Sequence, residues 1–269
     1  MKRFNLLMLL TATLLLAIGC TEEAATPNDD KKDKQEPDTK GLTAFVEDDV
    51  PTRTTAEYFN NGGLNRGLHY YWTAGDRLWV NNGGTLIQDA SNTIASKLEN
   101  NPANSSAVQR AAKANFWFNG TFTASSYPVR YTGKNGTKDK VTIKAAQSQT
   151  IPNDASHIGE DGDFGVATAT KPAGVAQYHF TLDHKATYIT FIPYTTQAWG
   201  PNAVIQKIRV YTSNTSDALA GTFDLADDGT LSNATTTSNS VELTVSNFSI
   251  PSTATYATNA ATMVVNPGT

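Results

Sequence analysis

The sequence has little cysteine and few of the motifs that carry catalysis. Cys20 is the only cysteine in 269 residues, so a disulfide framework is excluded and stability must come from burial. The four histidines, His69, His157, His179 and His184, stand in no HExxH or GxSxG motif, and no glycine-rich phosphate loop follows a strand-like segment. We therefore expect no enzyme, cofactor or metal, and we expect each histidine to be structural or exposed.

Strong positive charge is also missing. The net charge is −4, which excludes the basic balance typical of proteins that bind nucleic acid. Long apolar runs are missing after the first twenty residues. What is present is mainly Thr, Ser, Asn, Gly, Val and Tyr, a composition that favours twisted antiparallel sheets over helices. We therefore expect an all-β protein.

Residues 1–20 are typical of a signal peptide. Two basic residues precede an apolar run over about residues 6–16, which is too short to span a membrane. The tetrad AIGC (17–20) resembles a bacterial lipobox, although Ala17 departs from the leucine usual there. We expect Cys20 to be acylated and to anchor the protein in the outer membrane through lipid. The alternative is an ordinary secretory signal in which Cys20 is incidental.

Residues 21–41 predict a disordered tether. The segment TEEAATPNDDKKDKQEPDTKG is crowded with acids and lysines and has almost no apolar residue except alanine, so it cannot bury enough surface to fold. Glu22 and Glu23, directly after the lipidated cysteine, resemble an export signal to the outer face of the outer membrane. A solvated linker with no such signal is the alternative.

From residue 42 onward, short apolar segments of period two alternate with turn residues, as in a sandwich or barrel. Residues 42–47 alternate in this way. The further strands we expect are Arg77 to Val80, Asn115 to Thr123, Lys140 to Ala145, Tyr178 to Leu182, Thr187 to Pro193, Val204 to Thr212, Ser240 to Val245 and Ala261 to Val265. Four glycine turns predict tight hairpins, namely Asn82-Gly83-Gly84, Asn119-Gly120, Asn135-Gly136 and Asp228-Gly229. The alanine-rich piece 105–113 is the single helix expected.

Pro172 and Gly174 interrupt the strand pattern near residues 170–177, which predicts a domain boundary. We expect an N-terminal β-sandwich domain at 42–174 and a C-terminal one at 175–269. The last residues, NPGT, form a turn signal directly after a strand-like segment, so we expect the second domain to lack its last strands.

Two groups of side chains are candidates for binding. The cluster Glu160-Asp161-Gly162-Asp163 offers carboxylate oxygens to a cation but lacks the ligand spacing of a calcium loop, so we expect a solvated loop. Four aromatic residues offer a platform for a sugar, with packing in the core or at a domain interface as the alternative: Tyr70, Tyr71, Trp72 and Trp199.

The order of motifs resembles the fimbrillin family, the subunits and tip proteins of type V pili in anaerobic Gram-negative bacteria. The resemblance begins at the lipobox and spans most of the chain. Its further motifs are VPTRTT (51–56), YWTAGDRLWVNN (71–82), FNGTF (118–122), Tyr127-Pro128, Gln147-Ser148-Gln149, FGVATAT (164–170), FTLDHKATYITFIPY (180–194) and KIRVYTSNTSDALAGTFDL (207–225).

The resemblance implies two transthyretin-like sandwiches and export as a lipoprotein. It also implies that an arginine-specific protease removes the N-terminal segment, so that a strand from a neighbouring subunit fills the groove left behind. We expect the removable strand to be an edge strand over residues 42–47 and the cleavage site to be Arg53, with a plain surface arginine as the alternative reading and Arg66 as second choice. The implied partners are other pilus subunits, at the cell surface in a fimbrium.

A second function class stays open beside the pilus subunit or tip adhesin. It is a lipid-anchored surface protein that binds glycans or host ligands and never polymerises. A third class, a hydrolase, requires an assembled carboxylate or Ser/His pair in a cleft.

Overall fold

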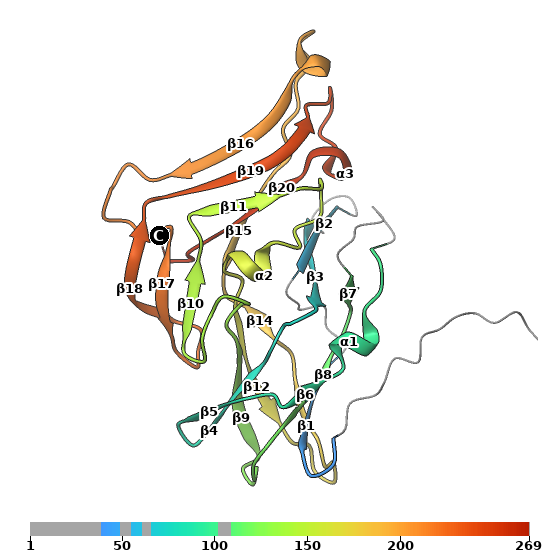
Figure 1. Cartoon of the computed structure of the whole chain (residues 1–269), viewed down its shortest axis with the longest axis vertical. Coiled ribbons are helices and arrows are strands. Elements are labelled where there is room, and N and C mark those ends of the chain that lie inside the picture. The colour runs from blue at the N-terminus through green and yellow to red at the C-terminus, as the bar shows by residue number, and fades with distance from the viewer. Residues whose placement is uncertain (1–38, 49–54, 61–65, 102–108, 269) are drawn as a thin grey trace, which may run out of the picture. The chain divides into compact units, whose positions relative to one another are not determined.

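The computed structural model of the chain describes residues 39–48, 55–60, 66–101 and 109–268 (Figure 1). These residues are mostly β-strand, so the expected all-β class is confirmed. The signal peptide with Cys20, most of the tether and Arg53 lie outside them, and lipidation and cleavage stay predictions. Within the described ranges, no helix is long and apolar enough to cross a bilayer.

The largest sheet has nine strands, and its path runs β5-β4-β9-β12-β13-β1-β8-β6 with β14 added beside β12. In that order the strands are β5 (Thr85–Gln88), β4 (Trp79–Asn82), β9 (Ser126–Tyr131), β12 (Gly165–Thr170), β13 (Tyr178–Phe180), β1 (Thr43–Glu47), β8 (Asn115–Phe118), β6 (Ser91–Asn92) and β14 (Asp183–His184).

Four smaller sheets complete the fold, and Figure 1 shows β16, β19 and β11 running side by side in one of them. Their strands are β10 (Lys140–Ile143), β17 (Ala220–Leu225) and β18 (Leu231–Ser238); β11 (Ala146–Gln149), β19 (Ser240–Ser249) and β16 (Val204–Tyr211); β2 (Thr55–Asn60), β3 (Arg66–Thr73) and β7 (Arg110–Ala111); and the pair β15 (Thr187–Phe191) and β20 (Ala261–Val265). The helical turns are α1 (Ile94–Lys97), α2 (Ile158–Asp161), η1 (Gly200–Asn202) and α3 (Tyr256–Asn259).

Each segment predicted as a strand contains one, with ends shifted by a few residues. The predicted alternation is also confirmed, because Phe116 and Phe118 are buried on one face of β8 and Val141 and Ile143 on one face of β10. Two expectations are wrong. The sheets are not purely antiparallel, since β1 with β13 and β11 with β19 pair in parallel. The predicted helix at 105–113 lies partly outside the described residues, and its described part contains the strand β7, which pairs with β3.

Two of the four predicted hairpins form. Gly83 and Gly84 have positive φ angles and connect β4 to β5, and Gly229 has a positive φ between β17 and β18. Such angles are accessible to glycine without a Cβ clash. The turns at Asn119-Gly120 and Asn135-Gly136 instead connect β8 to β9 and β9 to β10, pairs of strands that are not hydrogen-bonded to each other. A turn dipeptide thus marks a reversal of the chain but does not identify the pairing partner.

The core divides into two clusters of buried side chains. The aromatic cluster lies against the nine-stranded sheet and includes Phe45, Trp72, Phe116, Tyr178 and Phe180. The aliphatic cluster includes Val141, Ile143, Val241, Leu243, Met263 and Val264.

Segments on both sides of residue 174 enter both clusters. Residues 141–166 contribute Ile143 and Phe164 to the aliphatic cluster, while residues 178–182 contribute Tyr178 and Leu182 to the aromatic one. Residues 35–269 form one compact unit. The division into domains at 174/175 stays a prediction.

One buried cation links the two halves of the core. Arg130, on β9 of the nine-stranded sheet, is 5% exposed, and its Nη1 donates to the carbonyl of Leu225 at the end of β17 at 2.7 Å. Its Nη2 pairs with the carboxylate of Asp227. Because a buried charge without a partner is costly, this pair holds the β17–β18 hairpin against β9.

Candidate functional site

The strand β1 lies inside the nine-stranded sheet and not at its edge. It pairs antiparallel with β8, with Phe45 opposite Phe116, and parallel with β13, with Phe45 opposite Tyr178. The prediction of a strand at 42–47 is therefore confirmed, and the prediction that it is an edge strand is wrong. The reason is that residues 115–118 and 178–180, distant in sequence, both supply a pairing partner. Removal of an interior strand would open two strand edges at once.

Phe45 is the apolar anchor of β1. Its side chain is fully buried, and four aromatic rings surround it, which we call the aromatic shell. The ring centroids lie 4.7 to 6.5 Å from that of Phe45, in the order Tyr178, Phe118, Phe122 and Tyr127. The Tyr178 ring is stacked at 15°, and the Phe118 and Phe122 rings meet Phe45 edge-on. Edge-to-face and offset-stacked pairs add to the free energy gained by burial alone.

The aromatic shell is fixed by hydrogen bonds that do not involve β1. The hydroxyl of Tyr127 accepts from the backbone N–H groups of Thr123 and Ala124 at 2.8 and 2.9 Å. The hydroxyl of Tyr178 donates to the carbonyl of Ala124 at 2.7 Å. Two of the four rings are therefore anchored to the segment after β8, whatever occupies the place of Phe45.

Glu47, two residues after Phe45, is a buried carboxylate on the same face of β1. It is 3% exposed. Its Oε2 accepts from the indole Nε1 of Trp72 at 2.7 Å and from the backbone N–H of Ala114 at 3.2 Å. Trp72 is itself fully buried. Because two buried donors converge on one oxygen of its side chain, Glu47 fixes the position of β1 along the sheet.

The end of β1 is tied down at Asp48. Its N–H donates to the carbonyl of Phe180 at 2.9 Å, and its carboxylate lies 2.8 Å from Nδ1 of His179. The next described residue is Thr55, which begins β2 in a different sheet. The predicted cleavage site Arg53 falls in the intervening 49–54, outside the described residues. That segment is the covalent connection from β1 to everything that follows it.

The acidic cluster is mostly buried, so the prediction of a solvated loop is wrong. Asp161 is 5% exposed and lies 2.9 Å from Nδ1 of His157 and 3.0 Å from Nζ of Lys144. Asp163 is fully buried and lies 2.8 Å from Nδ1 of His184. Each carboxylate therefore has a partner that offsets its burial. Three or more metal-ligating side chains do not gather anywhere in the described part of the chain.

Asp163 also accepts a hydrogen bond from the hydroxyl of Tyr188 on β15. Burial, and then the charge of Asp163, raises the pKa of both Tyr188 and Tyr70 well above the usual range for a phenol. The Tyr70 ring stacks on His184 with centroids 3.9 Å apart. Asp163, His184, Tyr188 and Tyr70 therefore form one connected polar network inside the core. His184 has a structural role in this network.

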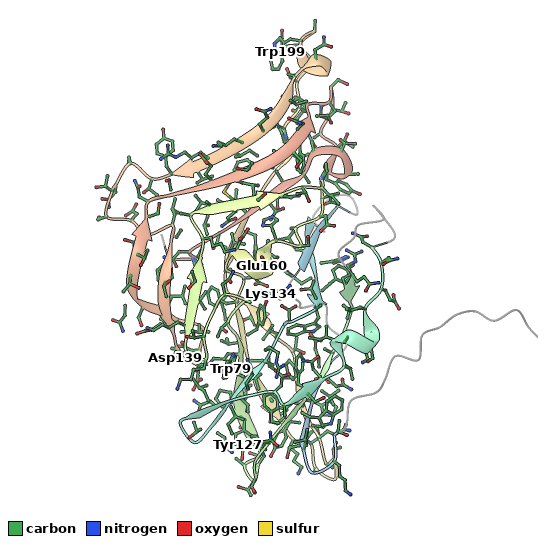
Figure 2. The ribbon with its side chains drawn as sticks, viewed as in Figure 1. Trp79, Tyr127, Lys134, Asp139, Glu160 and Trp199 are labelled. Carbon is green, nitrogen blue, oxygen red and sulfur yellow. The ribbon has the colours of Figure 1, made fainter. Side chains whose placement is uncertain are left out.

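Three of the four aromatic residues considered as a sugar platform have other contacts. Tyr70 stacks on His184, Tyr71 lies 3.8 Å below the guanidinium of Arg110, and Trp72 is in the core. Trp199 is 57% exposed, and Figure 2 shows it at the outer end of β16, away from the aromatic shell that contains Tyr127. For Tyr70 and Trp72 the packing alternative therefore holds, Tyr71 is half-buried beside Arg110, and Trp199 is the most exposed of the four.

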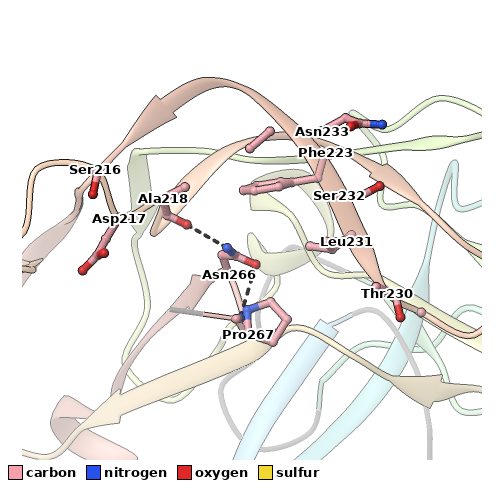
Figure 3. Close-up of a pocket in the computed structure, with 13 residues that line it drawn as sticks. Ser216, Asp217, Ala218, Phe223, Thr230, Leu231, Ser232, Asn233, Asn266 and Pro267 are labelled. Carbon is pink, nitrogen blue, oxygen red and sulfur yellow. Dashed lines mark hydrogen bonds between the residues drawn. The ribbon is translucent and has the colours of Figure 1, made fainter.

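A polar pocket lies between the β17–β18 hairpin and the turn after β20 (Figure 3). Its volume is about 560 Å³. Phe223 and Leu231 supply apolar surface, and no lysine, arginine or histidine lines it. The polar side chains around it are Ser216, Asp217, Thr230, Ser232, Asn233 and Asn266. Hydroxyls and carboxamides without a cation suit a neutral polyhydroxylated ligand better than an anion. The sequence reading missed this pocket because its wall combines residues 216–234 with residues 266–268.

No protein-family model, no curated protein and no solved structure matches the chain.

Proposed function

We propose that the chain is a fimbrillin-like structural subunit or tip adhesin of a surface pilus, exported as a lipoprotein on Cys20. In this proposal its β body corresponds to two transthyretin-like sandwich domains. The observation that carries the proposal is β1, an interior strand with a deeply buried anchor and a short connection to the following chain. Proteolysis in that connection makes the strand replaceable by another of the same shape.

The driving force for replacement is the free energy of an incomplete sheet. Loss of β1 would leave backbone N–H and C=O groups of β8 and β13 without partners and would empty the aromatic shell. Each buried backbone group left unpaired costs about 1–3 kcal/mol, and loss of a buried phenylalanine side chain costs about 3–5 kcal/mol. An incoming strand restores both kinds of contact by strand addition.

Repetition of this contact produces a filament. The surface that accepts a strand differs from the strand that is donated, so the contact is heterologous and does not close on itself. Neighbouring subunits in a pilus are therefore the partners that the proposal requires, and the lipid on Cys20 serves export and anchoring before the N-terminal segment is removed.

Limited digestion of the folded chain with an arginine-specific protease tests the cleavage step. We expect the first new N-terminus to be Thr54, as read by N-terminal sequencing. The substitution Arg53→Lys preserves the charge and should abolish this cut, whereas Arg66→Lys should leave it unchanged. A first cut elsewhere, or intact Arg53 after digestion, would contradict the proposed site.

Material sheared from cells tests the assembly step. Mature chains that begin at Thr54 within a ladder of heat-resistant oligomers support the pilus subunit. A purely monomeric, acylated protein that begins at Cys20 supports the anchored alternative instead.

The polar pocket favours that second candidate, a lipid-anchored surface protein that binds glycans or host ligands without polymerising. The test is binding of neutral oligosaccharides to the intact protein by calorimetry or on a glycan array. Ser232→Trp fills the pocket and should abolish binding, while Ser213→Trp, on an exposed turn outside the pocket, should preserve it. Equal binding by both variants, or none by the unmodified protein, removes this candidate.

A further inference from the structure

We infer that the partner strand accepted in place of β1 carries an aromatic residue followed two positions later by Glu or Asp. The inference rests on the proposed function, because it specifies the partner of the strand site. Its basis is the chemistry of the two buried sites that Phe45 and Glu47 occupy.

The first site selects an aromatic ring. Phe45 is fully buried and lies between the stacked ring of Tyr178 and the edges of Phe118 and Phe122. Since hydrogen bonds of Tyr127 and Tyr178 to the chain around Ala124 hold part of the aromatic shell, the site cannot collapse freely around a small side chain. A flat ring at this position recovers the stacked contact, which an aliphatic side chain lacks.

The second site selects a hydrogen-bond acceptor. The indole N–H of Trp72 and the backbone N–H of Ala114 converge on one carboxylate oxygen of Glu47, and all three groups are buried. An apolar side chain at this position would leave two buried donors without their acceptor, whereas a carboxylate accepts from both.

The spacing follows from strand geometry. Residues i and i+2 of a strand lie on the same face, so a ring and a carboxylate separated by one residue reach both sites together. The intervening residue, Val46, lies on the other face and is only partly buried. The pairings of β1, antiparallel to β8 and parallel to β13, fix the direction in which the triplet must run.

The 269 residues contain this triplet once, at Phe45-Val46-Glu47 itself. Every other phenylalanine, tyrosine or tryptophan is followed two positions later by a residue that is neither Asp nor Glu. Among these residues, the segment removed by cleavage after Arg53 is therefore the one whose side chains match both sites.

Peptide exchange tests this inference. The full chain is nicked after Arg53 with an arginine-specific protease, so that the N-terminal fragment stays bound, and is then mixed with an excess of a labelled peptide with the sequence of residues 42–48. Native mass spectrometry measures how much peptide replaces the fragment. Matched peptides carry Phe45→Ala, Glu47→Leu, Glu47→Gln or, as a control on the opposite face, Val46→Thr.

We expect the unmodified and Val46→Thr peptides to enter with affinities within about threefold of each other. Phe45→Ala and Glu47→Leu should each weaken binding by about 100-fold or more. Glu47→Gln should weaken it by about tenfold, because the amide retains an acceptor oxygen but brings an NH2 donor into the same buried site. Equal entry of all five peptides would overturn the triplet requirement while strand exchange itself stands. Failure of the unmodified peptide to enter would overturn strand exchange, and the inference with it.

Discussion

The strands β1 and β20 both contribute buried side chains to the core, but different contacts hold the two strands in place. β1 has a backbone partner on each side and carries one aromatic and one acidic anchor. β20 is buried at all five positions and has a backbone partner on one side, β15. β1 is therefore held by backbone pairing on both sides, whereas β20 depends on side chains along one of its edges.

The second edge of β20 is satisfied by two glutamines of β11. The amide of Gln147 donates to the carbonyl of Val264 at 2.7 Å and accepts from the N–H of the same residue at 2.9 Å. The amide of Gln149 donates to the carbonyl of Ala260 at 3.0 Å and accepts from the N–H of Thr262 at 2.8 Å. Two side-chain amides thus take the place of a neighbouring strand, and buried backbone groups are left satisfied without further pairing.

We expect the largest loss of stability when the aromatic anchor of β1, Phe45, is removed. Phe45→Ala should destabilise the intact chain by about 3–5 kcal/mol, because it removes buried apolar surface and leaves a cavity among rings that are held elsewhere. Denaturant-induced unfolding measures the change. Val46→Ala, on the partly buried opposite face, should cost clearly less; equal losses for the two variants would contradict the role of Phe45.

The acidic anchor comes next. Glu47→Leu should destabilise the chain by about 2–4 kcal/mol, since the N–H groups of Trp72 and Ala114 lose their buried acceptor. Glu47→Gln keeps an acceptor and should cost about half as much. Thermal unfolding checks both variants. A Leu variant as stable as the unmodified chain would show that the two donors find another partner.

The glutamines that cap β20 should give a smaller effect. Gln147→Leu removes one acceptor and one donor and should cost about 1–3 kcal/mol in unfolding free energy. Ser148→Ala is the matched control, because Ser148 is exposed between the two glutamines and its loss should change stability by less than about 0.5 kcal/mol. Indistinguishable unfolding curves for the two variants would mean that β20 does not depend on the amides.

The smallest effect we expect on stability comes from the pKa shifts of two carboxyl groups, Asp89 and Asp224. Burial raises the pKa of Asp89, whereas a hydrogen bond from Lys140 lowers that of Asp224 on β17. Burial of the ionised Asp89 carboxylate destabilises the folded state at neutral pH. This cost is removed as the pH falls and the carboxyl becomes protonated. For Asp224 the sign is opposite: its contribution is present above pH 3.8 and is lost as pH falls through its lower folded pKa.

Carboxyl titration followed by NMR checks the order of the two groups. Asp89 should titrate above 3.8 and Asp224 below it, and Lys140→Met should move the Asp224 midpoint upward without moving that of Asp89. A midpoint of Asp224 that stays in place in this variant would contradict the assigned cause.

Local pattern predicted the strands, and long-range pairing decided their roles. Period-two alternation was sufficient to place Phe116 and Val141 on buried faces, because alternation depends on a strand's own residues. The same pattern placed a strand at 42–47 but not its position inside the sheet, which depends on Phe116 and Tyr178, 71 and 133 positions further along the chain. Sequence also left the burial of Glu47 and Asp163 hidden, because a carboxylate is buried only where partners such as Trp72 or His184 converge on it in space.

The central claim is that β1 is a complete, exchangeable strand once its connection at 49–54 is cut. Isotope mixing tests it most directly: full chain nicked after Arg53 is prepared with and without a heavy-isotope label, the two samples are combined, and native mass spectrometry follows the complexes. We predict hybrid complexes that pair a heavy N-terminal fragment with a light body and the reverse. Parent masses alone after prolonged incubation, with both samples still folded, would contradict the claim.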